Sequence, residues 1–200
     1  MAVGIVGAGK IGRALAKHLT RAGFDVIISN SRGPESLRPL VAVLGPKAKV
    51  GTTAEAAAAP VVFLSVTWTQ LPAVLSKVPD WKGRIAVDMT NPYVADGSGM
   101  RLADLGGKTS SEVVAGMVPG ARLVKAFNTL FYVILASDPS EAGARRVIFL
   151  SGDDAKAKAE VSAVIDKLGF APIDLGGLVA GGRMQQAGGP LAGVNLLRKA

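Results

Sequence analysis

A glycine-rich run near the start of the chain constrains the fold more than any other feature of the sequence. Residues 2–6 before it are apolar, as expected of a buried strand, and apolar residues recur at helical spacing after it. The run reads Gly7-Ala8-Gly9-Lys10-Ile11-Gly12 and matches the pattern G-x-G-x-x-G. A strand, this turn and a helix in that order are typical of the first unit of a dinucleotide-binding fold.

Each glycine of the pattern has its own physical role in such a unit. Gly7 permits the tight turn, Gly9 lets the backbone approach a pyrophosphate, and Gly12 lets the helix pack close to the strand. The free N–H groups at the start of the helix then face the phosphates. We therefore expect a bound dinucleotide, and the alternative is a glycine-rich turn without a ligand.

The residues after the second expected strand, 26–29, indicate which dinucleotide binds. Enzymes that use NAD usually place Asp or Glu here, to accept hydrogen bonds from the ribose 2′-hydroxyl. This chain has Asn30, Ser31 and Arg32 instead. Arg32 offers a planar, charged fork to a 2′-phosphate, and the other two side chains can donate further hydrogen bonds. The sequence thus predicts NADP(H), with a solvated turn as the alternative.

Strand and helix patterns alternate along the rest of the chain. Further strands are expected at residues 49–51, 61–66, 85–89, 122–126, 146–150 and 170–173. Helices are expected at residues 35–43, 53–59, 68–77, 110–117, 154–168 and 191–198. Residues 91–107 have the composition of a loop, and residues 181–189 that of a glycine-rich linker.

This alternation predicts an α/β fold of the Rossmann type, with a doubly wound, mostly parallel sheet. We expect residues 1–128 to form the NADP-binding core. Residues 129–200 would form a small strand–helix–strand–helix extension packed on the same unit. The apolar side of the expected last helix, residues 191–198, would suit a homodimer contact.

Composition narrows the function further. The chain of 200 residues carries a formal net charge of +8, which favours an anionic partner, but its Lys and Arg residues are scattered, so nucleic acid is not expected. It contains no cysteine and one histidine, His18, expected to face solvent. Thiolate catalysis is excluded, and neither a metal site nor a Ser-His-Asp triad is expected. With no secretory signal and no membrane-spanning run, the cytoplasm is the expected location.

Several further motifs, together with the glycine pattern and the 29–32 segment, carry a family resemblance along nearly the whole chain. They are residues 65–68 (SVTW), 88–92 (DMTNP), 125–129 (KAFNT) and 152–154 (GDD). In this order they resemble the NADPH-dependent deazaflavin reductases, which pass a hydride between NADP and coenzyme F-420. The fold is also similar to the cytoplasmic reductase domain of the STEAP metalloreductases.

The resemblance implies a set of NADP contacts by position. Ala8, Lys10 and Ile11 would lie in the phosphate-binding turn, and Ser31 and Arg32 at the 2′-phosphate. The remaining implied contacts, along the nicotinamide half and its ribose, are Ser65, Val66, Thr67, Thr90 and Asn91. Archaeal members have His at the position of Asn128 and Pro at that of Thr67, so this chain departs from them on the deazaflavin side.

The second substrate is less constrained by the sequence. Asn128 and Thr129 are candidates for contact with it, and Arg183 and Met184 could close over it from the glycine-rich linker. Lys125 is a weak candidate for a proton donor. The hydride acceptor is expected to be a deazaflavin or a flavin. The alternatives are a reductase of a small ketone or imine and a non-enzymatic NADP(H)-binding sensor.

Overall fold

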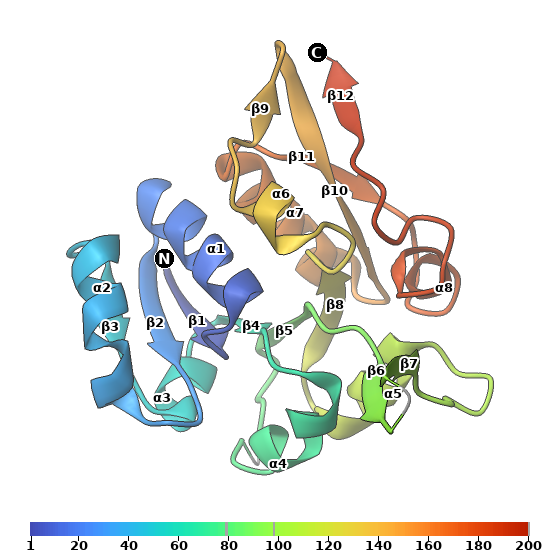
Figure 1. Cartoon of the computed structure of the whole chain (residues 1–200), viewed down its shortest axis with the longest axis horizontal. Helices are drawn as coiled ribbons and strands as arrows, with labels where there is room; N and C mark the ends of the chain where they lie inside the picture. Colours follow the sequence, from blue (N-terminus) through green and yellow to red (C-terminus); the bar gives the residue numbers. More distant parts are fainter. Residues whose placement is uncertain (79, 98, 200) are drawn as a thin grey trace.

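A single twisted sheet forms the centre of the protein (Figure 1). The computed structural model describes residues 1–78, 80–97 and 99–199. Along the sheet the strands follow the order β3-β2-β1-β4-β5-β8-β10-β11. Their bounds are β1 Ala2–Val6, β2 Asp25–Ser29, β3 Ala48–Val50, β4 Val61–Leu64, β5 Ile85–Asp88, β8 Arg122–Ala126, β10 Ala144–Gly152 and β11 Ala171–Asp174.

The six strands from β3 to β8 run parallel. β1 lies between β2 and β4, with Gly4 opposite both Ile27 and Val62. All four residues of β4 and of β5 are buried, as expected where helices cover both faces of a parallel sheet. The chain order reverses between β1 and β4, and ligands of open α/β sheets bind at such a switch point.

Helices cover both faces of this sheet. On one face, Leu15 and Leu19 of one helix and Val161 and Ile165 of another join the main core. On the other face, three shorter helices pack against the strands through a second apolar cluster. The first pair is α1 Lys10–Arg21 and α7 Ala155–Lys167, and the shorter three are α3 Thr53–Ala57, α4 Leu71–Leu75 and α5 Ser110–Met117. The expected helix at 35–43 is a 3-10 turn, η1 Pro34–Leu37, followed by α2 Arg38–Leu44, and η2 Trp68–Gln70 precedes α4.

The C-terminal part extends the sheet with reversed strands. β10 runs antiparallel to β8, with Leu150 opposite Ala126, and β11 runs parallel to β10. Two short strands, β9 Ser140–Glu141 and β12 Leu197–Lys199, flank the start of β10 at the end of the molecule that holds the C-terminus (Figure 1). A short helix, α6 Tyr132–Leu135, lies between β8 and β9. The predicted fold class is confirmed.

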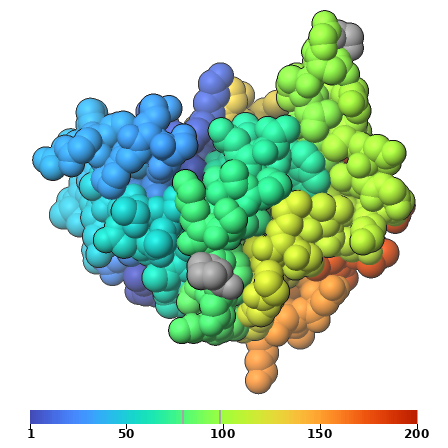
Figure 2. Space-filling view, turned by 90° about the horizontal axis from the view of Figure 1, so that it is seen from below, coloured from blue at the N-terminus to red at the C-terminus, as the bar shows by residue number. Residues whose placement is uncertain are grey.

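Two segments expected to be irregular are instead regular. Residues 91–107 contain a hairpin of β6 Tyr93–Asp96 and β7 Gly99–Leu102, which projects from the body of the protein (Figure 2). Its strands are largely exposed, so they lack the buried apolar pattern that identified the other strands. Within the expected linker 181–189, residues up to 185 belong to α8 Ala180–Gln185, where Gly181 and Gly182 are buried against neighbouring elements.

The predicted last helix at 191–198 is wrong. Gly193 adopts a φ of +78°, which interrupts a helix, and the chain then pairs with β10 as β12. Leu191 packs against the buried cluster of Val147, Phe149 and Ala171 within the protein. The helical face on which we expected a homodimer contact is therefore not formed.

The prediction that His18 faces solvent is also wrong. Its side chain is 4% exposed and its Nε2 lies 2.7 Å from the carbonyl oxygen of Leu135. The ring meets Phe170 edge-on, with centroids 5.2 Å apart. His18 thus ties α1 to the end of α6.

None of the helices in the described part of the chain has the length and apolar character needed to cross a bilayer.

Candidate functional site

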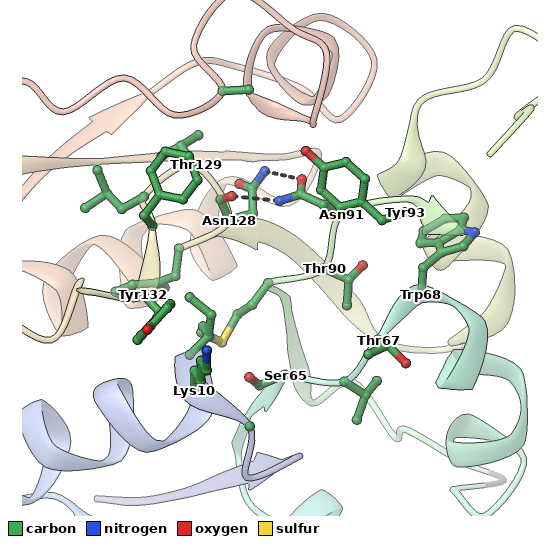
Figure 3. Close-up of a pocket in the computed structure, with 18 of the residues that line it drawn as sticks. Lys10, Ser65, Thr67, Trp68, Thr90, Asn91, Tyr93, Asn128, Thr129 and Tyr132 are labelled. Atoms are coloured by element: carbon green, nitrogen blue, oxygen red, sulfur yellow. Dashed lines mark hydrogen bonds between the residues drawn. The ribbon is translucent and has the colours of Figure 1, made fainter. Parts of the chain in front are cut away.

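A cavity of about 610 Å³ opens at the carboxyl ends of β1, β4, β5 and β8 (Figure 3). Each of these strands contributes the residues that directly follow it. The lining comprises Gly9, Lys10, Ile11, Ser65, Val66, Thr67, Trp68, Met89, Thr90, Asn91, Tyr93, Met100, Phe127, Asn128, Thr129, Leu130, Phe131, Tyr132, Ala192 and Gly193. The cavity therefore lies at the topological switch point, where a dinucleotide would bind in this architecture.

The glycine turn forms one wall, and its three glycines differ in what surrounds them. Gly7 has a φ of +106°, and a Cβ there would overlap the carbonyl oxygen of Ser65. A Cβ on Gly12 would overlap the carbonyl oxygen of Gly7. A Cβ on Gly9, by contrast, would meet no protein atom within 4 Å. Packing explains Gly7 and Gly12, whereas at Gly9 the backbone is open to a ligand.

The start of α1 is also left free. α3, α5 and α7 are capped by the side chains of Thr52, Thr109 and Asp154, respectively. α1 has Gly9 as its N-cap residue, with no side-chain cap and no acidic residue in its first turn. Its first N–H groups and the positive end of its dipole are thus available to an anion. These features fit the pyrophosphate of a dinucleotide.

The loop after β2 is preorganised around Asn30. The side-chain oxygen of Asn30 accepts a hydrogen bond from the backbone N–H of Arg32 at 3.0 Å, and its amide donates to Ser36 Oγ at 2.8 Å. Ser31 and Arg32 are exposed. Among the described residues, the Arg32 guanidinium has no ion-pair partner. Its charge is therefore available to a phosphate, while Asn30 holds the loop in shape.

A buried polar group forms the floor below the cavity. Lys125 Nζ lies 3.0 Å from Asp88 Oδ2 and 3.0 Å from the carbonyl oxygen of Thr90. Asp88 also accepts hydrogen bonds from the N–H and hydroxyl of Thr90 and from the hydroxyl of Ser111. Lys125 and Asp88 are fully buried. Lys125 is absent from the lining, so the structure places it where it orients Thr90 rather than where it could donate a proton to a substrate.

An amide pair links two strand ends above this floor. Asn91 Nδ2 donates to the carbonyl oxygen of Asn128 at 2.9 Å, and Asn128 Nδ2 donates back to Asn91 Oδ1 at 3.1 Å (Figure 3). Asn128 Nδ2 also donates to the carbonyl oxygen of Gln185 on α8 at 2.7 Å. The preceding Phe127 has a φ of +61°, a strained value for a bulky residue. The amide pair is thus held by three separate elements.

The mouth of the cavity has aromatic sides that sequence reasoning missed. Tyr93 and Met100 of the β6–β7 hairpin reach it from one side, and Phe131 and Tyr132 at the start of α6 from the other. Their exposed fractions lie between 41% for Tyr132 and 67% for Met100. No local motif marks these residues. The one available signal was that aromatic residues, Tyr93, Phe131 and Tyr132, come shortly after two expected strands.

The predicted site residues do not all reach the cavity, and the loop of Asn30, Ser31 and Arg32 lies outside its lining. Those at the strand ends, from Ser65 to Thr67, at Thr90 and Asn91, and at Asn128 and Thr129, come together around the cavity. Arg183 and Met184 do not line it. The Arg183 guanidinium donates to the carbonyl oxygen of Gly107 at 3.2 Å, and Met184 is 40% exposed. The next residue, Gln185, turns inward instead and donates to the carbonyl oxygen of Lys125 and to Ser151 Oγ.

Comparison with known proteins shows which families the chain is similar to. Residues 2–92 match the family model described as NADP oxidoreductase, coenzyme F-420-dependent. The chain is 32% identical over 179 residues to the metalloreductase STEAP3 of Rattus norvegicus, covering 89% of this chain and 34% of that protein. It is 25% identical over 180 residues to human metalloreductase STEAP2, covering 88% of this chain and 33% of that protein. The chain thus spans about a third of the length of the curated relatives it matches.

Two solved structures are similar to the chain over most of their own length. A hypothetical protein of Sinorhizobium meliloti is 44% identical and superimposes with a TM-score of 0.93, covering 99% of this chain and 96% of the other. A proposed F-420-dependent NADP reductase of Arthrobacter sp. FB24 is 28% identical, with a TM-score of 0.76, covering 88% and 84%. Through residues 2–92, which contain the glycine turn and the strands β1 to β5, this chain is similar to the family of coenzyme F-420-dependent NADP oxidoreductases.

Proposed function

We propose that this protein binds NADP(H) and transfers a hydride between it and a flavin or deazaflavin such as coenzyme F-420. The observation that carries the proposal is the make-up of the cavity. Among the described residues that line it there is no carboxylate and no histidine, while aromatic, amide and hydroxyl groups surround it. Transfer between two redox cofactors needs ring positioning more than acid–base catalysis, because the cofactors carry the chemistry.

The chain's own residues would divide the binding of NADP(H) between them. Gly9 and the start of α1 would hold the pyrophosphate, and Ser31 and Arg32 the 2′-phosphate. The residues after β4 and β5, among them Val66, Thr67 and Thr90, would border the nicotinamide half. When bound, NADPH supplies the hydride, and the acceptor takes up a proton from solvent.

The acceptor would occupy the part of the cavity between the hairpin and α6. The Asn91–Asn128 amide pair is fixed by hydrogen bonds at the back of this space, and exposed aromatic side chains border its mouth. Planar rings stack well between such groups. The absence of cysteine fits a reducing compartment, and we place the reaction in the cytoplasm.

The test is an anaerobic survey of acceptors with the purified protein. NADPH is mixed with oxidised coenzyme F-420, then with FMN, then with small ketones and cyclic imines, and nicotinamide and acceptor absorbance are followed together. We expect stoichiometric loss of NADPH and reduction of at least one of the two ring acceptors. Turnover of ketones or imines alone would establish the alternative reductase. Binding of NADPH without turnover of any acceptor would favour the sensor.

A further inference from the structure

The charge of the cavity resides in one side chain. Among the described residues that line it, Lys10 carries the only formal charge. No ion pair to Lys10 occurs within the described part of the chain. An unpaired ammonium beside a cavity without a carboxylate favours an anionic group in that cavity.

The position of the ammonium is defined by an aromatic ring. Lys10 Nζ lies over the ring of Tyr132, 4.4 Å from its centroid, so a cation–π contact joins the start of α1 to the start of α6 (Figure 3). Both side chains are exposed, and Tyr132 is 41% exposed. The pair therefore sits at the mouth of the cavity and not at its floor.

This position separates the side chain of Lys10 from the other groups assigned to NADP(H). Arg32 follows β2, on one side of β1 in the sheet, whereas Tyr132 follows β8, on the other side. The backbone of Lys10 belongs to the phosphate-binding turn, but its side chain points to α6, which borders the space left for the acceptor. The side chain thus faces the part of the cavity in which we place the acceptor.

We propose that the Lys10–Tyr132 pair binds an anionic group, a phosphate or carboxylate, on the flexible side chain of the hydride acceptor. The inference rests on the proposed function and narrows its substrate to ring acceptors with an anionic tail. The ring enters the cavity while the tail remains at the mouth, where the ammonium meets it. A phosphate or carboxylate there forms a charge-assisted hydrogen bond with Lys10.

The test compares ligands that share a ring and differ in the tail. Dissociation constants for FMN and riboflavin, and for coenzyme F-420 and its deazaflavin chromophore without phosphate and glutamate, are measured by fluorescence on protein saturated with NADP⁺. We expect the anionic member of at least one pair to bind about fivefold or more tightly, the size of an exposed charge interaction near 1 kcal/mol. Raising the salt concentration to about 0.5 M should reduce this preference.

Variants test whether the Lys10–Tyr132 pair causes the preference for the anionic ligand. Lys10→Met and Tyr132→Leu should remove most of it, whereas Tyr132→Phe, which keeps the ring, should retain it. Lys17→Met is the matched control, because it removes the same charge from an exposed position on α1 that does not line the cavity.

The proposal is overturned if the anionic and the neutral ligand of each ring type bind equally tightly, or if neither ligand binds. It is also overturned if Lys10→Met keeps the wild-type preference for the anionic ligand. Binding with the preference but without hydride transfer would refute the proposed function and leave the anion site standing.

Discussion

Gly9 and Gly12 belong to one turn but are required for different reasons. A Cβ on Gly9 would enter space that no protein atom occupies, whereas a Cβ on Gly12 would overlap the carbonyl oxygen of Gly7. We expect Gly9→Ala to leave the free energy of unfolding nearly unchanged and to raise the dissociation constant of NADPH about tenfold, since the methyl group would occupy the place of the pyrophosphate. Gly12→Ala should instead lower the free energy of unfolding by about 1–3 kcal/mol, as overpacking does.

Urea unfolding and NADPH titration of both variants check this pair. Equal NADPH affinity in Gly9→Ala and the wild type would contradict the assignment of the turn to the pyrophosphate.

Arg32 is the residue on which the choice of NADP(H) over NAD(H) depends. Its exposed guanidinium has no ion-pair partner among the described residues and lies beside a loop held by Asn30. We expect the wild type to bind NADPH about tenfold or more tightly than NADH, a difference of about 1.4 kcal/mol. Arg32→Ala should abolish this difference by weakening NADPH alone.

Arg38→Ala serves as the control, because Arg38 is exposed and pairs with Glu35 at 2.6 Å. It should leave the preference in place. An Arg32→Ala variant that still prefers NADPH would show that another group reads the 2′-phosphate.

At the scale of elements, the Lys125–Asp88 pair joins β8 to β5 and fixes the residues that follow β5. The pair is fully buried, so a single replacement leaves the partner charged and unpaired. Lys125→Met should lower the free energy of unfolding by about 3–5 kcal/mol. Replacing both residues, Asp88→Asn with Lys125→Met, should recover part of that loss, because no uncompensated charge remains.

Chemical denaturation of the single and double variants measures this coupling. Additive losses in the double variant would contradict a direct interaction between the two charges.

The contact between α1 and α6 makes stability depend on pH. Burial lowers the pKa of His18 below its ordinary value of 6.5, against the opposing effect of the hydrogen bond with the Leu135 carbonyl. The unfolded chain therefore binds a proton at a higher pH than the folded protein does. The stabilisation that comes from burying His18 in its neutral form is present above pH 6.5 and is lost as the pH falls below that value.

His18→Gln keeps a donor for the Leu135 carbonyl and does not titrate. We expect the free energy of unfolding of this variant to change little between about pH 6.5 and 5, where that of the wild type falls. Urea unfolding at several pH values measures both. The same slope in both proteins would assign the pH dependence to other groups.

At the scale of the whole molecule, the parts predicted from sequence are those with local signals. The strands β1, β4 and β5 are largely apolar because helices bury both of their faces, and the glycine turn is a contiguous motif. The β6–β7 hairpin has no such signal, since Tyr93 and Leu102 pair across it while 45% and 41% exposed. Likewise, the expected last helix had the right apolar spacing, but the positive φ of Gly193 and the pairing of β12 with β10 prevent a helix there.

The candidate site also has parts with a local sequence signal and parts without one. The residues that we assign to NADP(H) lie in the glycine turn or directly after strands, so their place in the fold could be predicted from the sequence, whereas their contacts with NADP(H) stay a prediction. The Asn128–Gln185 hydrogen bond joins residues 57 positions apart. The Lys10–Tyr132 contact joins α1 and α6, which are separated in the sequence by most of the strands of the sheet. Neither is encoded locally. His18 could have been placed inside, because it lies beside Leu15 and Leu19 on the buried face of α1.

The most direct test of the central claim follows the transferred hydrogen itself. NADPH deuterated at C4 of the nicotinamide, in both stereochemical forms, is incubated with the protein and an oxidised deazaflavin, whose accepting carbon retains the hydrogen that it receives. We predict that one form delivers its deuterium to the deazaflavin ring without loss to solvent, as seen by mass spectrometry of the reduced product. Reduced deazaflavin that carries only solvent hydrogen, or no reduction at all, would contradict hydride transfer between NADPH and a deazaflavin in this cavity.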